Sequence, residues 1–204
     1  GEAVALDHAA QFSLLSGLYD AYCRRKEAHI LILGLDHAGK TTLLEQMKGL
    51  YSDRRGVPVD KIGPTVGLNL ARLHVGQYQA TFWDLGGHVG VRSIWQKYYA
   101  DANAVIFVVD SSDLERLTEA RTVIEEIGRH DLLHGKPVLV LANKQDLAEA
   151  RTATDIGGHL RLDSGLQETS FAVRGISALR SEGIQDAMAW MLDALDERGA
   201  AAGR

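Results

Sequence analysis

The run GLDHAGKT, residues 34–41, carries the residue types that hold a phosphate chain. It matches the spacing G-x-x-x-x-G-K-[ST] and lies between an apolar run and a helical pattern. Glycines let the backbone curl so that several N–H groups face one anion, and the following helix adds its positive end. A chance glycine turn is the alternative, which the strand–helix context disfavours. The residues predicted to bind nucleotide here are Gly34, Asp36, His37, Ala38, Gly39, Lys40, Thr41 and Thr42.

A magnesium site is predicted from hydroxyl and carboxylate groups in three parts of the chain. The Thr41 hydroxyl can ligate Mg²⁺ directly, and Thr65, in the run GPTVG, supplies a second hydroxyl. Asp84 ends an apolar run and can hold the ion through water. Gly87 completes the pattern D-x-x-G, and its N–H can meet a terminal phosphate. Loops tied in this way order when that phosphate is present and relax when it leaves.

The run NKQD, residues 143–146, predicts that the base is guanine. The Asp146 carboxylate can accept both the ring N–H and the exocyclic amino group of guanine, whereas adenine offers no such pair of donors. Asn143 can brace the loop, and the aliphatic stem of Lys144 can lie over the base. A second run, ISAL, offers a backbone N–H to the guanine carbonyl, although a strand-to-helix turn with a serine cap would look the same. Its residues are Ser177, Ala178 and Leu179.

The elements that must position these groups are predicted to alternate between strands and helices. Apolar runs at 29–34, 103–110 and 136–143, with a weaker one at 169–177, indicate strands buried on both faces. The runs 67–75 and 77–84 flank Gly76 and indicate a hairpin. Helical patterns are expected at about 40–50, 92–100, 114–129 and 182–197.

These elements predict an α/β fold of the P-loop NTPase class. Its sheet would be mostly parallel and six-stranded, with one antiparallel hairpin strand and helices on both faces. The chain is expected to divide into a disordered or cloning-derived segment at 1–11, an amphipathic helix at 12–27, a nucleotide-binding domain at 28–198 and a flexible tail at 199–204.

The composition is that of an ordinary globular chain and excludes several classes. The 204 residues fit one domain, and the formal net charge of −5 offers no basic stripe, so no nucleic-acid partner is expected. Cys23 is the one cysteine, which excludes a disulfide within the chain. No apolar run reaches the ~18 residues that indicate a spanning helix.

The predicted helix at 12–27 has an apolar face and a basic end formed by Arg24, Arg25 and Lys26. This pattern suits reversible binding to an anionic membrane surface, and a helix packed on the domain is the alternative. The residues predicted to face the membrane are Phe12, Leu15, Leu18, Tyr19 and Tyr22.

The motifs GLDHAGKTTLL, PTVGLN, WDLGG, IFVVDSSD and LVLANKQDL resemble, in order and spacing, the Ras-like small GTPases, and specifically their ADP-ribosylation factor (Arf/Arl) branch. The resemblance covers about residues 12–195. Asp36 in the P-loop and Trp83 before the acid are typical of that branch. The runs LLSGLYDAY and DKIGPTVGLN, and the long connection before Thr65, are similar to the Arf-related protein subfamily.

The resemblance implies a Ras-like G domain that switches between GTP and GDP with Mg²⁺. An exchange factor would load GTP, an activating protein would speed hydrolysis, and GTP-dependent effectors would be recruited in membrane or vesicle traffic. The hairpin would slide in register on loading and displace the N-terminal helix toward a membrane. The expected location is cytoplasmic, with reversible association with the cytosolic face of the Golgi or other endomembranes.

The resemblance also assigns an effector surface. Leu68, Trp83 and Tyr98 stand at the positions of an apolar effector-binding triad, whose first member is commonly Phe. Partial burial in the core is the alternative for the two aromatic residues, because aromatics are common both in cores and at interfaces.

The run FWDLGGHVGV departs from the family at the residue after its two glycines. The family usually has Gln there to orient the attacking water, and this chain has His88. Neutral imidazole can accept a hydrogen bond from water, but it is shorter and stiffer than Gln, and geometry decides phosphoryl transfer. We expect slow intrinsic hydrolysis with activation in trans, where a finger residue supplies about 10³ to 10⁵ in rate.

Two other functions stay open on the sequence alone. His88 is compatible with a nucleotide-locked, non-cycling scaffold or a structural subunit of a larger complex. A P-loop ATPase or nucleotide kinase is disfavoured by NKQD and by the lack of an Arg-rich lid segment.

Overall fold

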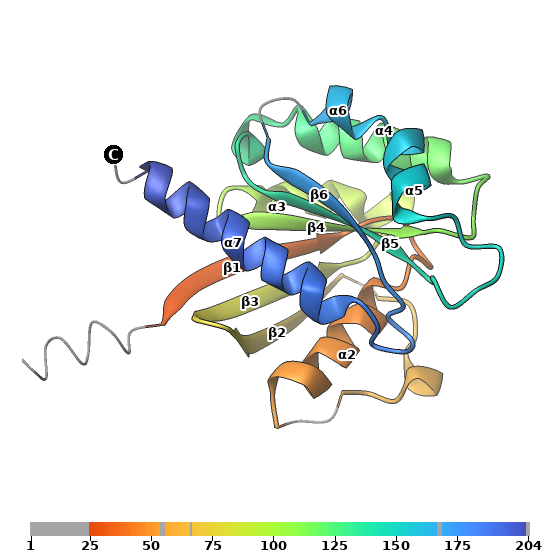
Figure 1. Cartoon of the computed structure of the whole chain (residues 1–204), viewed down its shortest axis with the longest axis horizontal. Coiled ribbons are helices and arrows are strands. Elements are labelled where there is room, and N and C mark those ends of the chain that lie inside the picture. The colour runs from red at the N-terminus through yellow and green to blue at the C-terminus, as the bar shows by residue number, and fades with distance from the viewer. Residues whose placement is uncertain (1–24, 54–55, 66, 167–168, 203–204) are drawn as a thin grey trace, which may run out of the picture.

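The computed structural model describes residues 25–53, 56–65, 67–166 and 169–202 (Figure 1). Within these residues six strands form one sheet in the order β2-β3-β1-β4-β5-β6, in which the β2–β3 pair is antiparallel and every other neighbouring pair is parallel. The predicted fold class is therefore confirmed. The strands are β1 (Lys26–Leu33), β2 (Leu68–Val75), β3 (Tyr78–Leu85), β4 (Ala104–Asp110), β5 (Val138–Asn143) and β6 (Phe171–Gly175).

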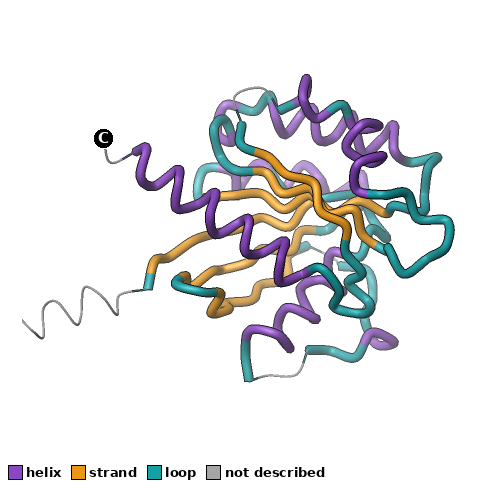
Figure 2. Tube along the Cα trace, viewed as in Figure 1, coloured by secondary structure: helices purple, strands orange, loops and turns teal. Residues whose placement is uncertain are grey.

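Helices cover both faces of this sheet because its central strands are apolar on both sides (Figures 1 and 2). In β1, Ile30 and Ile32 belong to one buried cluster, which includes residues of α2 and α7. Leu31 and Leu33 belong to a second cluster, which includes residues of α4 and α5. The α-helices are α2 (Lys40–Tyr51), α3 (Gln96–Tyr99), α4 (Leu117–Gly128), α5 (Ala153–Leu160), α6 (Leu162–Gly165) and α7 (Ile184–Ala202), and the 3₁₀ turns are η1 (Val59–Lys61), η2 (Val89–Ile94) and η3 (Asp131–Leu133).

One predicted helix takes a different form. The helix expected at 92–100 is the six-residue 3₁₀ turn η2 followed by the four-residue α3. Arg92 Nε donates to the Gly87 carbonyl at 2.7 Å, and Trp95 Nε1 donates to the Gly86 carbonyl at 2.9 Å. These bonds tie the segment to the loop that precedes it, which suits the tighter 3₁₀ geometry.

The helix α5 was not predicted, although its start has a local signal. Thr152 and Asp155 form a reciprocal capping box, and the buried Ile156 and Leu160 follow with helical spacing. The run T-x-x-D before these two apolar residues would have found it.

Both predicted domain boundaries shift. β1 begins at Lys26, so the last two residues of the helix expected at 12–27 are strand, held by pairing with β3 and by a bond from the Lys26 ammonium to Asp196 of α7. Residues 12–24 of the predicted helix, with its five predicted membrane-facing residues, lie outside the described residues, and Arg25 is described and exposed. At the other end α7 extends to Ala202, so 199–202 are helical and not a flexible tail, because the alanines favour helix.

No helix in the described part of the chain combines the length and apolarity that crossing a membrane requires.

Candidate functional site

The predicted site residues gather at one edge of the sheet. Loops that follow the carboxyl ends of β1, β3, β4, β5 and β6 meet there, because these strands run in one direction. This edge is where open α/β sheets bind ligands. Gly34 follows β1 and opens the P-loop, and Thr42 lies in the first turn of α2.

The backbone of the P-loop is shaped by residues in the left-handed region. Gly39 caps α2 with a φ of 93°, and a Cβ there would lie 2.3 Å from the Asn143 amide nitrogen. His37 adopts a φ of 62° without being glycine, and its side chain is 77% exposed. The His37 side chain therefore faces solvent, and nucleotide binding by this residue stays a prediction.

Lys40 is a buried cation at the start of α2, with 6% of its surface exposed. Its ammonium donates to the Leu35 carbonyl at 2.7 Å, which uses one of its donors and orients the others. Burial lowers the pKa of Lys40 to about 8, against the opposing attraction of the Asp84 and Asp36 carboxylates. Among the described residues the bond to Leu35 is the one hydrogen bond of the Lys40 ammonium, and its other two donors can bind anionic oxygen.

The three predicted metal ligands converge. The hydroxyls of Thr41 and Thr65 lie 2.5 Å apart, and Thr41 donates to Asp84 Oδ2 at 2.7 Å. Asp84 is fully buried, and its other oxygen, Oδ1, has no hydrogen-bond partner among the described residues. Burial raises the pKa of Asp84, opposed by the Thr41 hydrogen bond and the Lys40 charge. Hydroxyl and carboxylate oxygens are the ligands that Mg²⁺ prefers, and the orphaned Oδ1 leaves an acceptor for a bound water, so the residues fit the ion.

Gly87 lies directly on the P-loop. A Cβ there would be 2.4 Å from the Lys40 ammonium nitrogen and 2.5 Å from the Asp36 backbone nitrogen, so no larger residue fits without displacement. Its carbonyl accepts from Arg92, and Arg92 also donates to Glu119 at 2.6 Å. Arg116 bridges Glu119 and Asp36, with 2.6 Å to the Asp36 carboxylate. We name these four side chains (Arg92, Glu119, Arg116 and Asp36) the charge chain; it joins the Gly87 loop to the P-loop through α4.

Asn143 braces two loops on the base side, as predicted. It is 2% exposed, and its amide nitrogen donates to the Ala38 carbonyl at 2.8 Å. Its amide oxygen accepts from the Ala178 backbone N–H at 2.9 Å. One side chain thus fixes the P-loop, β5 and the loop after β6 relative to one another.

Asp146 and Lys144 also have protein partners. The Ser177 hydroxyl donates to Asp146 Oδ1 at 2.5 Å, and Ser177 itself is fully buried. Lys144, at a φ of 68°, pairs with Asp110 at 2.5 Å. The Lys144 bond and others outweigh burial and lower the pKa of Asp110.

His88 is exposed and engaged with its own backbone. Its Nδ1 accepts from the Gly90 N–H at 3.2 Å and so caps η2. With Nδ1 as the acceptor, a neutral imidazole carries its proton on Nε2, which then donates and does not accept. In this conformation His88 therefore offers water no acceptor.

Two of the three predicted effector residues, Leu68 and Trp83, lie on one face of the hairpin, and Tyr98 of α3 packs against Trp83. Leu68 is 39% exposed on β2, while Trp83 and Tyr98 are half-buried with ring centroids 5.4 Å apart. Leu70, opposite Trp83 in the hairpin and 52% exposed, joins them and was not predicted. The two aromatics are packed against the core and still reach the surface, so their partial burial is shown, and effector binding stays a prediction.

Sequence reasoning missed the partners that come from other elements. Leu179 is 53% exposed at the rim, as its loop position suggests. No motif marked the arginines and the glutamate of the charge chain, and the run IFVVDSSD, which contains Asp110, gave that residue no role at the site. Only the order of strands brings β4 and α4 beside the P-loop. Binding of nucleotide by the assembled residues stays a prediction.

Comparison with known proteins gives one consistent answer. The sequence model described as the ADP-ribosylation factor family matches residues 14–195. The chain is 42% identical to ADP-ribosylation factor-related protein 1 of Homo sapiens over 89% of its own length and 91% of that protein, and 41% identical to ADP-ribosylation factor-like protein 3 of Saccharomyces cerevisiae over 91% and 94%. The solved structure of the Arl6 BBS3 small GTPase from Trypanosoma brucei, with a bound nucleotide analogue GppNp, superposes with a TM-score of 0.74 at 31% identity, covering 84% of this chain and 99% of that one. The chain belongs to the ADP-ribosylation factor family of small GTPases, which are GTP-binding molecular switches.

Proposed function

We propose that this chain binds GTP and GDP with Mg²⁺ and recruits effectors in membrane or vesicle traffic when GTP is bound, with slow intrinsic hydrolysis. An exchange factor loads GTP, and an activating protein completes the hydrolytic site. The protein works at the cytosolic face of the Golgi or other endomembranes, to which its N-terminal segment attaches it reversibly.

The convergence of Thr41, Thr65 and Asp84 beside Lys40 carries this proposal. Thr65 comes from the loop before β2, and Asp84 lies near the end of β3, directly before the loop that contains Gly87. Both loops therefore meet the P-loop at the point where a terminal phosphate and its ion would lie. Loss of that phosphate removes the contact that orders both loops, which is the physical basis of a switch.

Each residue has a separate task in this scheme. Lys40 and the P-loop N–H groups bind the β- and γ-phosphates, and Gly87 presents its N–H to the γ-phosphate. The hydroxyls of Thr41 and Thr65 and, through water, Asp84 would hold Mg²⁺, which when bound neutralises charge on the phosphates. Asp146 reads the guanine edge, and Lys144 lies over the base while Asp110 holds its ammonium.

Effector recruitment is supported by the apolar face on the hairpin. Leu68 and Leu70 expose large apolar side chains to water next to Trp83 of β3, and β3 leads into the loop that contains Gly87. A surface contiguous with a nucleotide-sensitive loop changes shape with the nucleotide, so binding there reports the loaded state.

Slow hydrolysis is supported by the contact between His88 and Gly90. For His88 to accept a hydrogen bond from the attacking water, its ring must leave the cap and change tautomer or rotate. A docked partner can supply that rearrangement together with a charged finger residue. The same contact favours the second candidate, a nucleotide-locked scaffold in which His88 serves only to cap η2.

Single-turnover hydrolysis of preloaded GTP in the presence of Mg²⁺ separates the two candidates. Wild type is compared with His88→Gln, and with Val89→Gln as a control at the neighbouring exposed position. A cycling switch hydrolyses slowly, and His88→Gln hydrolyses faster because its acceptor is not committed to the cap. Nucleotide that neither exchanges nor turns over in either protein would contradict the switch and favour the scaffold.

A further inference from the structure

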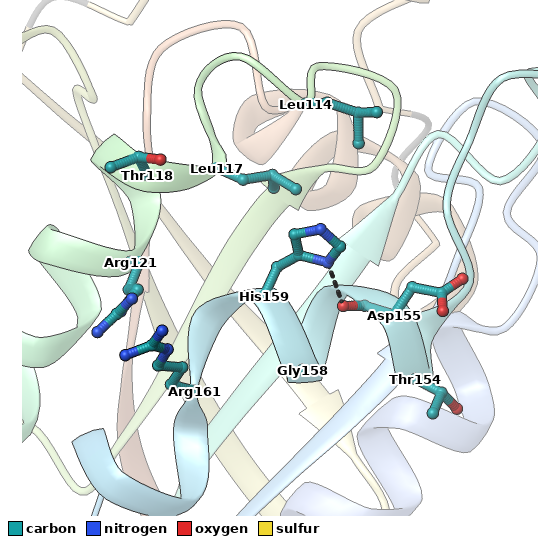
Figure 3. A pocket seen from close by; sticks show the side chains of 9 residues that line it. All are labelled: Leu114, Leu117, Thr118, Arg121, Thr154, Asp155, Gly158, His159 and Arg161. Carbon is teal, nitrogen blue, oxygen red and sulfur yellow. Dashed lines mark hydrogen bonds between the residues drawn. The ribbon is translucent and has the colours of Figure 1, made fainter.

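A groove lies between α4 and α5, on the face of the sheet opposite α2 and α7 (Figure 3). Its cavity volume is about 600 Å³, and it is open to solvent. The lining comes from α4, from the loop before it and from α5 and its end. None of the predicted nucleotide, metal or effector residues contributes to it, so the groove is a separate feature of the molecule.

One end of the groove carries excess positive charge. Figure 3 shows the guanidinium groups of Arg121 and Arg161 at this same end. Arg121 shares Glu125 with Arg129, at 2.8 and 3.3 Å, and all three arginines lower the pKa of that one carboxylate. The Arg161 side chain has no hydrogen-bond or ion-pair partner within the described ranges. Among the described residues, Glu125 is the one carboxylate that forms an ion pair with any of these three arginines, in a chain whose net charge is −5.

The remaining acid of the lining does not balance this charge. The Asp155 carboxylate accepts from the Thr152 hydroxyl at 2.8 Å in the capping box of α5. In Figure 3 it lies at the end of the groove away from the arginines. Its charge is committed to the helix N-terminus, which it stabilises.

The middle of the groove is lined by two leucines and a histidine ring. Leu114, 41% exposed, and Leu117 lie along one side, with the His159 ring facing them. His159 is fixed by its contact with the Asp155 carbonyl at 2.8 Å. We name the apolar surface formed by Leu114 and Leu117 the Leu114 ledge. A bare anion would not contact this surface, whereas a peptide can cover it with one side chain and pair the next side chain with the arginines.

We propose that this groove binds an acidic segment of a partner protein, in which an apolar side chain lies on the Leu114 ledge and neighbouring carboxylates pair with Arg121 and Arg161. Guanidinium groups suit such carboxylates because their donors match both oxygens. No P-loop residue and no residue of the loops around Thr65 and Gly87 lines the groove, so this contact does not depend on which nucleotide is bound. It gives the protein a constitutive partner beside its nucleotide-dependent ones.

Fluorescence anisotropy of a fluorescein-labelled peptide, with glutamates flanking one leucine, tests the proposal on the full chain. Four competitors accompany it: the same peptide with lysine for glutamate, the same peptide with serine for leucine, inorganic phosphate, and phosphatidylserine vesicles. The variants are Arg121→Gln combined with Arg161→Gln, and Leu114→Ser, with Arg174→Gln as a control at an exposed arginine on β6. Their melting curves and amide NMR spectra verify the fold, and the shifts of Thr118 and Gly158 locate the peptide.

We expect saturable binding that falls by about tenfold or more in the arginine pair and in Leu114→Ser, since each removes a contact to a charged or apolar group. Arg174→Gln should bind as wild type does, and the affinity should be equal with GDP and with a non-hydrolysable GTP analogue. Absence of binding, or binding undiminished in the arginine pair, overturns the proposal.

Two competition results also overturn it. If phosphate displaces the labelled peptide as well as the unlabelled peptide does, the groove is an anion site. If phosphatidylserine vesicles displace the peptide, the groove is a lipid site. Peptide binding does not require bound nucleotide. A protein that fails to bind GTP, which would contradict the proposed function, can therefore still bind the peptide.

Discussion

The phosphate side and the base side of the candidate site differ in how many of their polar groups are already paired. On the phosphate side, within the described residues, the buried Lys40 ammonium donates only to the Leu35 carbonyl, and Asp84 Oδ1 has no partner. On the base side, Asn143 is bonded at both ends and Asp146 accepts from Ser177. The phosphate side is therefore completed by its ligand, whereas the base side is preorganised by the protein. Substitutions on the phosphate side should lower the affinity for nucleotide. Substitutions that remove a hydrogen-bond partner on the base side should lower the free energy of unfolding.

Lys40→Met should have the largest effect on binding. We expect nucleotide affinity to fall by at least about 100-fold, because charge-assisted bonds to phosphate are lost. The unliganded protein should melt no lower than wild type, because the change removes a buried charge that burial disfavours. Equilibrium titration with fluorescent GDP and thermal melting measure the two quantities. A destabilised Lys40→Met protein with normal affinity would reverse the assignment of the phosphate side.

Asn143→Ala should reverse that pattern. It leaves the Ala38 carbonyl and the Ala178 N–H without their partner, so we expect a loss of about 2–4 kcal/mol in the free energy of unfolding. Ser111→Ala is the matched control, since Ser111 is also fully buried but its hydroxyl has no partner in the described part of the chain. Denaturant unfolding of the unliganded proteins checks both. Equal losses in the two variants would show that burial alone, and not bracing, sets the cost.

Asp146→Asn should relax the choice of base without comparable loss of stability. An amide keeps a partner for Ser177 but cannot accept both guanine donors, so we expect discrimination of GDP against inosine diphosphate to fall by about 10-fold. Competition for a bound fluorescent nucleotide measures this ratio. If the ratio is unchanged, the reading of guanine by this carboxylate is wrong.

Glu119→Gln should have the smallest effect and a selective one. It weakens the charge chain that positions Arg92 on the Gly87 carbonyl, and Gly87 faces the γ-phosphate. We expect a GTP analogue to dissociate a few-fold faster while GDP release stays the same. The control is Glu126→Gln on the exposed face of the same helix. A change of both release rates by the same factor would make Glu119 a structural residue of α4 only.

The contrast between the two sides also explains what the sequence could predict. The P-loop and NKQD are local, so their residue types and spacing identify Lys40, Thr41 and Asn143 before any fold is known. Thr65 and Asp84 can be identified as ligands once the two segments that carry them are assigned to the same metal ion. The partner of Lys144 is Asp110, on a neighbouring strand, and the partner of Asp36 is Arg116, directly before α4. These contacts depend on the order in which strands assemble, which periodicity does not encode.

His88 shows a different limit. The sequence raised the question whether His88 positions the attacking water, but it could not show that its Nδ1 accepts a hydrogen bond from the backbone N–H of Gly90. That bond fixes the tautomer, and with it the hydrogen bonds that the ring can offer. Side-chain identity alone leaves this open, because both ring nitrogens can serve either purpose.

The dissociation of fluorescent GDP, and of a fluorescent non-hydrolysable GTP analogue, in Mg²⁺ and after chelation by EDTA, tests the central claim most directly. If the phosphate side is completed by nucleotide and ion, both nucleotides leave slowly in Mg²⁺ and much faster once it is chelated. Thr41→Ala should abolish this difference because it removes a hydroxyl ligand. Rates that are the same with and without Mg²⁺, or a protein that retains neither nucleotide, would contradict the account.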